Sequence, residues 1–217
     1  GNAGIHHSRT LLAGEIPDAR LTAVCESGPP ERQANARALV GENVQVFGDA
    51  EEFLASGACD AVLVATPHPL HPELAIRALA HGLHVLIEKP AGIHTRQGRE
   101  MNAAAAKSDR AFGIMFGYRA LPINQRVKQL VDAGDLGPVQ RTLCVATHWF
   151  RPQKYYDGGG WRATWAGEGG GVLINQAPHT LDLLQWVCGM PRRIRAFCSF
   201  GRFHDIEVED EVTAYLE

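Results

Sequence analysis

Short apolar runs alternate with amphipathic segments along the first half of the chain. The run at 61–65 is continuously apolar, which is typical of a strand buried on both faces of a parallel sheet. The other predicted elements are strands at 21–25, 44–47, 85–88 and 111–116, and helices at 1–12, 31–39, 50–56, 71–81 and 95–107. Because strand and helix alternate throughout, the sequence predicts an α/β fold with a doubly wound parallel sheet.

The pattern changes near Tyr118 and Arg119, where we place a boundary between two domains, 1–118 and 119–217. The predicted elements after it are a helix ending near 133, a long strand at 139–150, an amphipathic helix at 172–187, and strands at 193–200 and 211–216. A loop rich in aromatic residues and glycine separates the long strand from the helix that follows. The second domain is therefore expected to be α+β, with an open, mainly antiparallel sheet.

Composition narrows the class of partner. The 217 residues are 45% hydrophobic and 21% charged, with a net charge of -3, so the chain has no basic footprint for nucleic acid or an anionic membrane. No apolar run is long enough for a membrane span. Five widely spread cysteines without a C-x-x-C pair favour reduced thiols and a cytoplasmic location. A small-molecule partner is expected.

The first candidate for chemistry is Lys89. The strand at 85–88 ends in Glu88, and Lys89 and Pro90 follow directly. Ligands bind outside the carboxyl ends of the strands in open parallel sheets, so ionisable groups at this point are candidates for a functional role. The alternative is a solvated loop in which the proline only ends the strand.

The start of the chain carries a degenerate glycine pattern. Gly1 and Gly4 are glycines, whereas Ala3 and His6 occupy the other glycine positions of a dinucleotide fingerprint. A helix N-terminal turn without a ligand explains the same residues. Glu26, about 20 residues further on, ends the strand at 21–25, where a carboxylate could bind the ribose hydroxyls of NAD and repel the 2′-phosphate of NADP. A surface carboxylate is the alternative.

Histidines occur in two settings. His68, His71, His81 and His84 lack carboxylates or cysteines at ligand spacing, so no metal site is expected. In the helix expected at 172–187, one stripe carries four polar or aromatic side chains, those of Asn175, His179, Asp182 and Trp186. The alternatives to a functional stripe are a solvated face and a core histidine held by Asp182.

Taken together, the motifs of this chain resemble those of the Gfo/Idh/MocA oxidoreductases, the glucose-fructose oxidoreductase and inositol dehydrogenase family. The ordered set that carries the resemblance is Thr66-Pro67-x-x-x-His71, Glu88-Lys89-Pro90, Tyr118-Arg119-x-x-Pro122, Gly134-x-x-Gly137, Trp161-Arg162 and Gly169-Gly170-Gly171-Val-Leu-Ile-Asn175-Gln176-Ala-Pro-His179-x-x-Asp182. Each motif is weak alone, but the set spans essentially the whole chain in the family's order and spacing.

The resemblance implies a dinucleotide-binding Rossmann domain over 1–118 and a substrate-binding and oligomerisation domain over 119–217. It further implies NAD(P)-dependent hydride transfer on a sugar, inositol or related polyol, with NAD favoured and NADP as the alternative. By analogy Lys89 holds the reacting oxygen and His179 exchanges its proton. A histidine titrates near neutral pH, and an ammonium stabilises developing alkoxide charge, so this division of roles is chemically sound.

Other site residues are expected by the same resemblance. The cofactor contacts implied are Gly1, Gly4, Ile5, Glu26, Thr66, Pro67, His71, Glu88, Lys89 and Arg119. The substrate contacts implied are Tyr155, Tyr156, Trp161, Arg162, Asn175 and His179. Asn175 is also placed in the catalytic set, and a homo-oligomer, dimer or tetramer, is expected through the C-terminal sheet.

Three departures from the family pattern matter. Many members carry aspartate where this chain has Asn175, and an amide cannot relay a proton, so Asn175 is expected to bind the substrate or orient His179. The fingerprint is degenerate at Ala3 and His6. The first strand of the Rossmann sheet and the later part of the second sheet are absent from the sequence, so we expect an incomplete copy of a longer chain.

Two other functions remain open from sequence. One is a glycosidase that uses tightly bound NAD as a transient oxidant, which predicts release of sugar without net formation of NADH. The other is a non-catalytic nucleotide or sugar sensor on the same fold. A sensor would be expected to lose the catalytic pair, yet Lys89 and His179 are both present.

Overall fold

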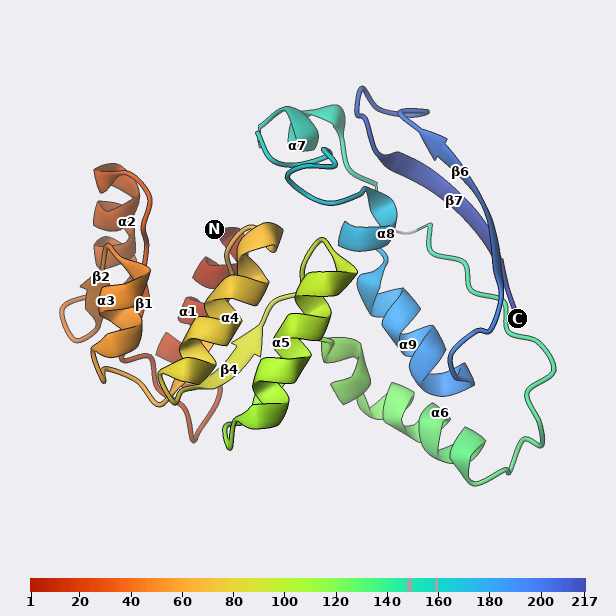
Figure 1. Ribbon diagram of the computed structural model, residues 1–217, viewed down its shortest axis with the longest axis horizontal. Coiled ribbons are helices and arrows are strands. Elements are labelled where there is room, and N and C mark those ends of the chain that lie inside the picture. The colour runs from red at the N-terminus through yellow and green to blue at the C-terminus, as the bar shows by residue number, and fades with distance from the viewer. Residues whose placement is uncertain (148–149, 159) are drawn as a thin grey trace. The chain divides into compact units, whose positions relative to one another are not determined.

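A computed structural model of the chain describes residues 1–147, 150–158 and 160–217. The chain divides into two compact units (Figure 1). The first comprises Gly1–Thr66, Leu70–Ala91 and Thr95–Ile114, and the second comprises Pro67–Pro69, Gly92–His94 and Met115–Glu217. Each unit is described by itself.

The first unit is built from short parallel strands and the helices between them. Its strands are β1 (Ala23–Cys25), β2 (Gln45–Phe47), β3 (Ala61–Val64), β4 (His84–Ile87) and β5 (Phe112–Ile114). Its helices are α1 (Asn2–Leu12), α2 (Pro30–Val40), α3 (Ala50–Ala55), α4 (His71–Ala80) and α5 (Thr95–Lys107). The 3-10 turn η1 (His68–Leu70), which begins in the second unit, precedes α4. The strand–helix alternation and the approximate position of every predicted element are confirmed.

The strands form two parallel sheets, β1-β2 and β3-β4-β5. Residue 61 of β3 pairs with His84 of β4, and Val85 pairs with Phe112 of β5, so the three carboxyl ends lie at one edge. Helices α4 and α5 lie side by side along this sheet (Figure 1). The core beneath them is apolar, with Ile87 and Met101 almost completely buried.

One expectation for β3 is wrong. The continuous apolar run predicts burial on both faces, yet Ala61 is exposed, the next two residues are half-buried, and only Val64 is buried. Among the described residues β3 pairs on one side only, with β4, so its other edge has no neighbouring strand to cover it. Apolar composition alone therefore overestimates the burial of this strand.

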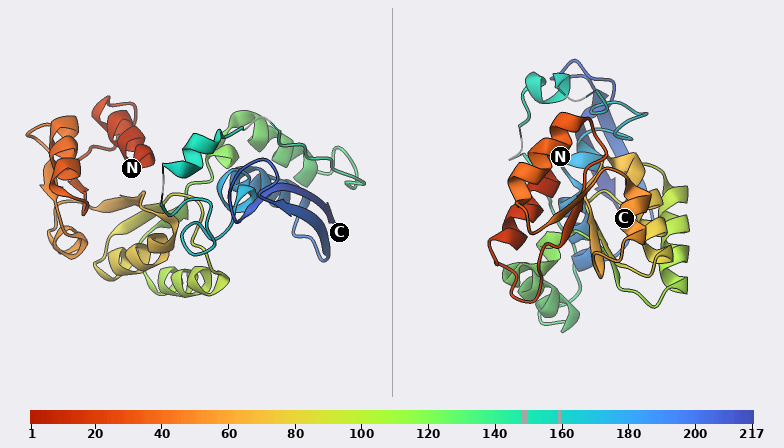
Figure 2. Two further views of the ribbon diagram at one scale, coloured as in Figure 1. Left: turned by 90° about the horizontal axis from the view of Figure 1, so that it is seen from above. Right: turned by 90° about the vertical axis from the view of Figure 1, so that its left-hand side faces the viewer.

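The second unit combines short helices with an antiparallel pair of strands. Its elements are η2 (Gly117–Ala120), α6 (Pro122–Asp132), α7 (Gln153–Asp157), α8 (Val172–Asn175), α9 (Pro178–Cys188), β6 (Ile194–Phe200) and β7 (Glu209–Leu216). The strands β6 and β7 run side by side in Figure 1 and in the left view of Figure 2, with Ile194 opposite Leu216 and a register shift between Ser199 and Phe200. The predicted antiparallel sheet is confirmed for this pair.

Two predictions for the second unit are wrong. Residues 139–147 and 150 form no strand, and residues 148 and 149 of the same prediction lie outside the described residues. The segment 139–147 is exposed along its length and pairs with no strand in the described part of the chain, so its β-branched residues gain no ladder to stabilise an extended strand. The helix expected at 172–187 is two helices, because Pro178 lacks the N–H that would continue the helical hydrogen bonds.

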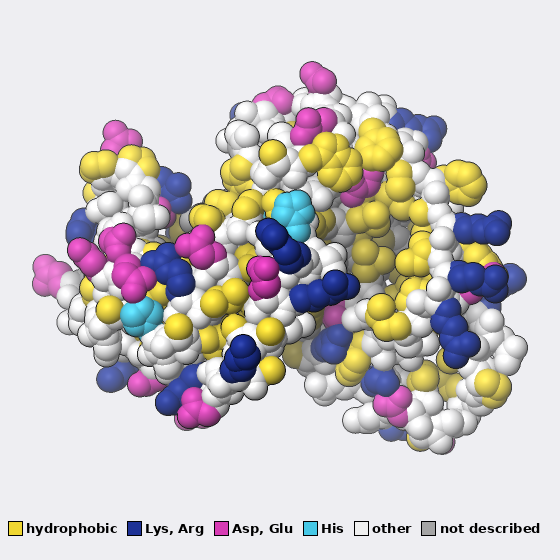
Figure 3. Space-filling view, viewed as in Figure 1, with side chains coloured by type: hydrophobic (Ala, Val, Ile, Leu, Met, Phe, Trp, Pro, Cys, Tyr) yellow, Lys and Arg dark blue, Asp and Glu magenta, His cyan; other side chains and the backbone are white. Residues whose placement is uncertain are grey.

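The surface of the second unit carries many large apolar side chains. Leu143, Phe197 and Met190 are each more than 70% exposed, and Figure 3 shows such side chains, in yellow, across the visible face of this unit. No helix in the described ranges is both long and apolar enough to cross a membrane.

Candidate active site

The N-terminus of α1 lies against the carboxyl edge of the β3-β4-β5 sheet. Gly1 precedes the first turn of the helix, and a Cβ added at Gly4 would lie 3.8 Å from the Cβ of Ala65, directly after β3. The Nε2 atom of His7 lies 2.6 Å from an Oε1 atom of Glu88, directly after β4. The helix start and two strand ends therefore meet, which is the arrangement that receives a pyrophosphate in dinucleotide-binding folds.

Thr66 supplies a test of whether this edge suits a ligand. Its Oγ1 atom is buried and has no hydrogen-bond partner among the described residues, although buried hydroxyls are normally paired. An unpaired hydroxyl beside a helix N-terminus fits a polar ligand such as a dinucleotide. Pro67, which follows, is exposed, and so is Ile5 on α1, which is 39% exposed.

Glu26 stands at the end of β1, as the sequence predicts for a ribose contact. Its Oε1 atom accepts a hydrogen bond from the Gly28 N–H at 2.9 Å, and its Oε2 atom accepts one from Arg32 at 2.9 Å. A carboxylate has acceptor sites beyond these two, so Glu26 can still bind a hydroxyl. The sequence analysis did not single out the neighbouring Arg32. Its guanidinium could bind a 2′-phosphate, so the argument against NADP is weaker.

The segment Glu88-Lys89-Pro90 is held on both sides of the lysine. The Lys89 N–H donates to Oε2 of Glu88 at 3.2 Å, and the Glu88 N–H donates to the Val64 carbonyl at 2.9 Å. The peptide bond between Lys89 and Pro90 is cis. His71 is 1% exposed, with Nδ1 2.8 Å from the Pro90 carbonyl oxygen and Nε2 2.8 Å from that of Thr66. His71 therefore contacts this edge of the sheet through backbone carbonyl oxygens.

In the second unit, His179 is enclosed by aromatic rings. Its ring stacks on Tyr118 at 4.9 Å between centroids, with an interplanar angle of 24°, and meets Phe116 edge-on at 6.2 Å. The residue lies in the first turn of α9, after Pro178. Packing of this kind fixes the plane of the imidazole, which a proton-transfer group requires.

Arg119 and Asp182 form a two-pronged ion pair. The Nε and Nη2 atoms of Arg119 donate to the two carboxylate oxygens of Asp182 at 2.7 and 2.5 Å, and these hydrogen bonds raise the pKa of the guanidinium. The Asp182 side chain is only 4% exposed, and Arg119 also lies over the ring of Trp186. The pair joins η2 to α9, and both carboxylate oxygens of Asp182 are hydrogen-bonded to Arg119.

A buried carboxylate that the sequence reasoning missed, Glu168, organises the aromatic loop. It is 1% exposed, accepts a hydrogen bond from the Ala163 N–H at 2.6 Å and from the Asn175 side-chain amide, and lies 3.5 Å from Arg162. The hydroxyl of Tyr155 accepts from Arg162 at 2.6 Å and from Asn175 at 3.3 Å. A lone carboxylate between two glycines, after an arginine and aromatic residues, is the signal that could have identified it.

Aromatic rings flank this cluster. The Arg162 guanidinium lies 4.6 Å from the ring centroids of both Tyr155 and Trp161. The Trp161 ring in turn meets His68, whose Nδ1 lies 3.3 Å from the Glu168 carbonyl oxygen. Stacked aromatic rings beside hydrogen-bonding groups are suited to a polar organic ligand.

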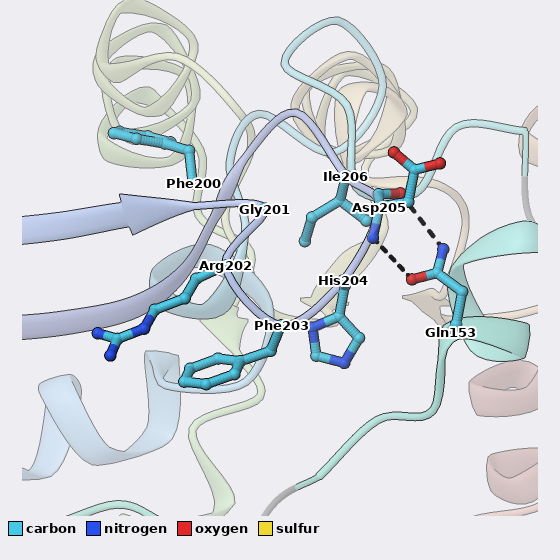
Figure 4. A pocket seen from close by; sticks show the side chains of 8 residues that line it. All are labelled: Gln153, Phe200, Gly201, Arg202, Phe203, His204, Asp205 and Ile206. Atoms are coloured by element: carbon cyan, nitrogen blue, oxygen red, sulfur yellow. Dashed lines mark hydrogen bonds between the residues drawn. The ribbon is translucent and has the colours of Figure 1, made fainter.

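The turn between β6 and β7 forms a neighbouring hollow. In Figure 4 the side-chain amide of Gln153 makes two hydrogen bonds with the backbone of Asp205, which fasten the turn to α7. A second cavity of about 310 Å³ is lined by residues that include Tyr156, Gln176 and His204. Burial raises the pKa of the Tyr156 hydroxyl, so the ring contributes a neutral hydroxyl to this cavity.

The structure thus groups the expected site residues within each unit. Gly1, Gly4, Thr66, His71, Glu88 and Lys89 gather at one sheet edge of the first unit, with Glu26 at the end of β1. Asn175, Tyr155, Arg162 and Trp161 form one cluster of the second unit, and His179 and Arg119 lie on α9 and η2. Because the helix is broken, Asn175 and His179 do not share one helical stripe as predicted. Among the described residues no group of three metal-ligating side chains could hold a metal ion.

Comparison with known proteins identifies the family. Residues 1–116 match the model for an oxidoreductase family with an NAD-binding Rossmann fold, and residues 124–217 match the GFO/IDH/MocA C-terminal domain. The chain is 32% identical over 176 residues to D-glucoside 3-dehydrogenase of Escherichia coli, covering 80% of this chain and 48% of that protein. It is 28% identical over 197 residues to inositol 2-dehydrogenase of Burkholderia ambifaria, covering 87% and 52%.

Solved structures agree with this match. The crystal structure of the WlbA dehydrogenase of Bordetella pertussis, in complex with NADH and UDP-GlcNAcA, aligns with a TM-score of 0.89 at 32% identity, covering 100% of this chain and 64% of that one. The chain spans about half the length of the curated relatives that it matches. On the family matches, which together cover most of its length, this chain belongs to the Gfo/Idh/MocA family of NAD-binding oxidoreductases.

Proposed function

We propose that this protein is an NAD-dependent oxidoreductase that transfers a hydride between the nicotinamide cofactor and a sugar, inositol or related polyol. The observation that carries the proposal is the edge of the first unit, where the start of α1 and the segment bearing Lys89 meet the Thr66 hydroxyl, which has no hydrogen-bond partner in the described part of the chain. The family match and the relatives named as sugar and inositol dehydrogenases support it.

Different residues of this unit would bind different parts of NAD. The first turn of α1 would hold the pyrophosphate on its backbone N–H groups, and Glu26 would accept hydrogen bonds from the ribose hydroxyls. The Thr66 hydroxyl would donate to the cofactor and so gain the partner that it lacks among the described residues. When bound, the nicotinamide ring supplies the hydride chemistry.

Lys89 and His179 would carry the proton side of the reaction. The Lys89 ammonium would hold the reacting oxygen and stabilise the charge that develops on it. His179, fixed between Tyr118 and Phe116, would accept the hydroxyl proton on oxidation and return it on reduction. A hydride leaves a carbinol carbon readily only while that proton is being removed, so the two residues would act together.

The cluster around Asn175 would bind the hydroxyl groups of the substrate. Arg162 faces the buried Glu168 carboxylate, so the two opposite charges offset each other and the cluster offers hydrogen bonds without a net charge. That character suits a neutral polyhydroxy ligand. Tyr155 and Trp161 would add apolar surface for the carbon faces of a sugar ring. Oligomerisation through the antiparallel sheet stays a prediction.

A titration and a substrate panel test the proposal. The purified protein is titrated with NAD and with NADP, and absorbance at the NADH band is then followed with a panel of polyols and aldoses. We expect NAD to bind more tightly and NADH to form with at least one polyol or aldose. Binding of NAD without NADH from any member would overturn the dehydrogenase assignment, and binding of neither cofactor would overturn the cofactor site.

A substitution then tests the role of Lys89. Lys89→Met should lower kcat by at least about a hundredfold while NAD affinity changes little, because the lost charge acts on the reacting oxygen. Lys107→Met, on the exposed end of α5, is the matched control and should leave kcat unchanged. Equal rates for both variants would remove Lys89 from the mechanism.

A further inference from the structure

We propose that two histidines, His7 and His71, are positioning residues that hold the segment 88–90 from its two ends and thereby fix Lys89. Neither histidine is placed in contact with the reacting atoms. The inference rests on the proposed function for its kinetic consequence, but the placement of Lys89 can be measured without any reaction.

His71 holds the end of the segment that follows the lysine. It is the first residue of α4 and is almost completely buried, and its two ring nitrogens reach the carbonyl oxygens of Pro90 and Thr66, each at 2.8 Å. A carbonyl oxygen can only accept, so each contact is a hydrogen bond where the ring nitrogen that faces it carries a hydrogen. One side chain thus joins the end of β3 to the residue after Lys89.

His7 holds the end that precedes the lysine. Its Nε2 atom lies 2.6 Å from Oε1 of Glu88, while Oε2 of the same carboxylate accepts the N–H of Lys89 at 3.2 Å. Both side chains are partly buried, at 21% and 17% exposed, so the contact is less accessible to water than a pair on the surface. The carboxylate therefore links α1 directly to the backbone of Lys89.

The two contacts matter because lysine itself is flexible. Its four-carbon side chain has many rotamers, so the position of its backbone decides where the ammonium can reach. Displacement of a catalytic group by about 1 Å can cost a hundredfold in rate. Because His7 belongs to the helix whose N-terminus faces the proposed pyrophosphate site, it also couples the placement of the cofactor to that of the lysine.

Selective labelling gives a direct readout of this placement. The chain contains four lysines, Lys89, Lys107, Lys128 and Lys154, so a spectrum of the ¹⁵N-lysine protein has four backbone amide signals, and Lys89→Arg identifies the first. We expect His7→Phe and His71→Gln to shift or broaden the Lys89 signal and leave the other three in place. His7→Gln, which keeps a donor toward Glu88, should restore much of the wild-type position.

A matched control is available in the same unit. The Nε2 atom of His81 lies 2.8 Å from an Oε1 atom of Glu51, a histidine–carboxylate contact of the same kind at the other end of α4. His81→Phe should leave the Lys89 signal unchanged. An unmoved Lys89 signal in both His7→Phe and His71→Gln, or an equal shift in His81→Phe, would overturn the proposal. If His71→Gln fails to fold, the His7 pair of variants decides it.

Kinetics separate this inference from the proposed function. With a substrate found in the panel, His7→Phe should lower kcat by about tenfold and change the KM for the sugar by less, because a misplaced lysine fails mainly in the transition state. If His7 had only a structural role, His7→Phe would lower the stability of the protein and leave kcat unchanged. Should the wild type reduce no NAD at all, the proposed function fails while the Lys89 amide signal still decides the placement.

Discussion

The side-chain amide of Asn175 donates a hydrogen bond to the buried carboxylate of Glu168. The same amide nitrogen also points at the Tyr155 hydroxyl, so Nδ2 is committed as a donor. This relationship explains why an amide stands where many family members carry aspartate. A carboxylate at 175 would face the buried Glu168 at hydrogen-bonding distance, and two like charges so close cannot both ionise without a large cost.

Asn175→Asp should therefore destabilise the protein in a pH-dependent way. The paired carboxylates would bind a proton more tightly in the folded protein than in the unfolded chain, so the deficit grows as the pH rises. We expect a loss of about 2 kcal/mol in the free energy of unfolding at pH 8 and a much smaller loss at pH 5. Urea unfolding at both pH values measures it, with Asn102→Asp on the exposed face of α5 as the control. A loss of equal size at both pH values would contradict the pairing.

Arg119→Met should leave Asp182 buried without its partner. The aspartate is 4% exposed and both of its oxygens are occupied by the guanidinium, so the variant loses two charge-assisted hydrogen bonds. We expect a loss of about 2 kcal/mol in the free energy of unfolding. Arg126→Met, on exposed α6, should cost little. If Arg119→Lys kept full stability, the two-pronged geometry would be irrelevant and charge alone would hold the pair.

The parallel sheet of the first unit could be predicted because its signals are local. Apolar runs, a proline at the start of α2 and the acidic cap of α3 each act within a few residues. Lys89 could be identified as a candidate site residue because it directly follows a strand. The same reasoning did not find the His7–Glu88 contact, which joins residues 81 positions apart. No periodicity connects a helix start to a distant strand end.

The second unit was predicted less well, for physical reasons that differ by residue. Pro178 marks the break between α8 and α9, but the apolar periodicity on both sides of it favoured a continuous helix. The segment 139–147 has the composition of a strand, and composition cannot tell whether a partner strand is present to pair with it. Glu168 was missed because its importance comes from burial, which depends on Asn175 and Arg162 folding around it.

Alanine substitution at two glycines, Gly171 and Gly98, should change the stability of the protein in opposite directions. A Cβ on Gly171, at the start of α8, would collide with the backbone carbonyl of Glu209, which cannot rotate away as a side chain would. Gly171→Ala should cost at least about 2 kcal/mol. A Cβ on Gly98, inside α5, would meet nothing within 4 Å, so Gly98→Ala should gain about 1 kcal/mol from helix propensity. Thermal unfolding of both variants tests these two predictions. If Gly171→Ala were stabilising, Gly171 at the start of α8 would not lie this close to the Glu209 carbonyl of β7.

Asp210 should make the turn between β6 and β7 sensitive to acid. Burial alone would raise the pKa of its carboxyl, but hydrogen bonds from the N–H groups of Phe203, Arg202 and His204, and from the His204 ring, outweigh burial and lower that pKa. Since the folded pKa lies below the unfolded one, near 3.9, the carboxylate contributes stability that is fully present above that value. The contribution is lost as the pH falls through the folded pKa.

Asp210→Asn should accordingly reduce the free energy of unfolding by about 2 kcal/mol at pH 7, while its difference from the wild type shrinks toward zero in strong acid, where the wild-type carboxyl is itself protonated. Urea unfolding followed from pH 7 to pH 2 measures the two curves. Asp135→Asn, at an exposed position after α6, serves as the control and should parallel the wild type at every pH. If the free energies of unfolding of Asp210→Asn and the wild type differed by the same amount down to pH 2, the loss would come from the shape of the amide. The charge on Asp210 would then not stabilise the turn.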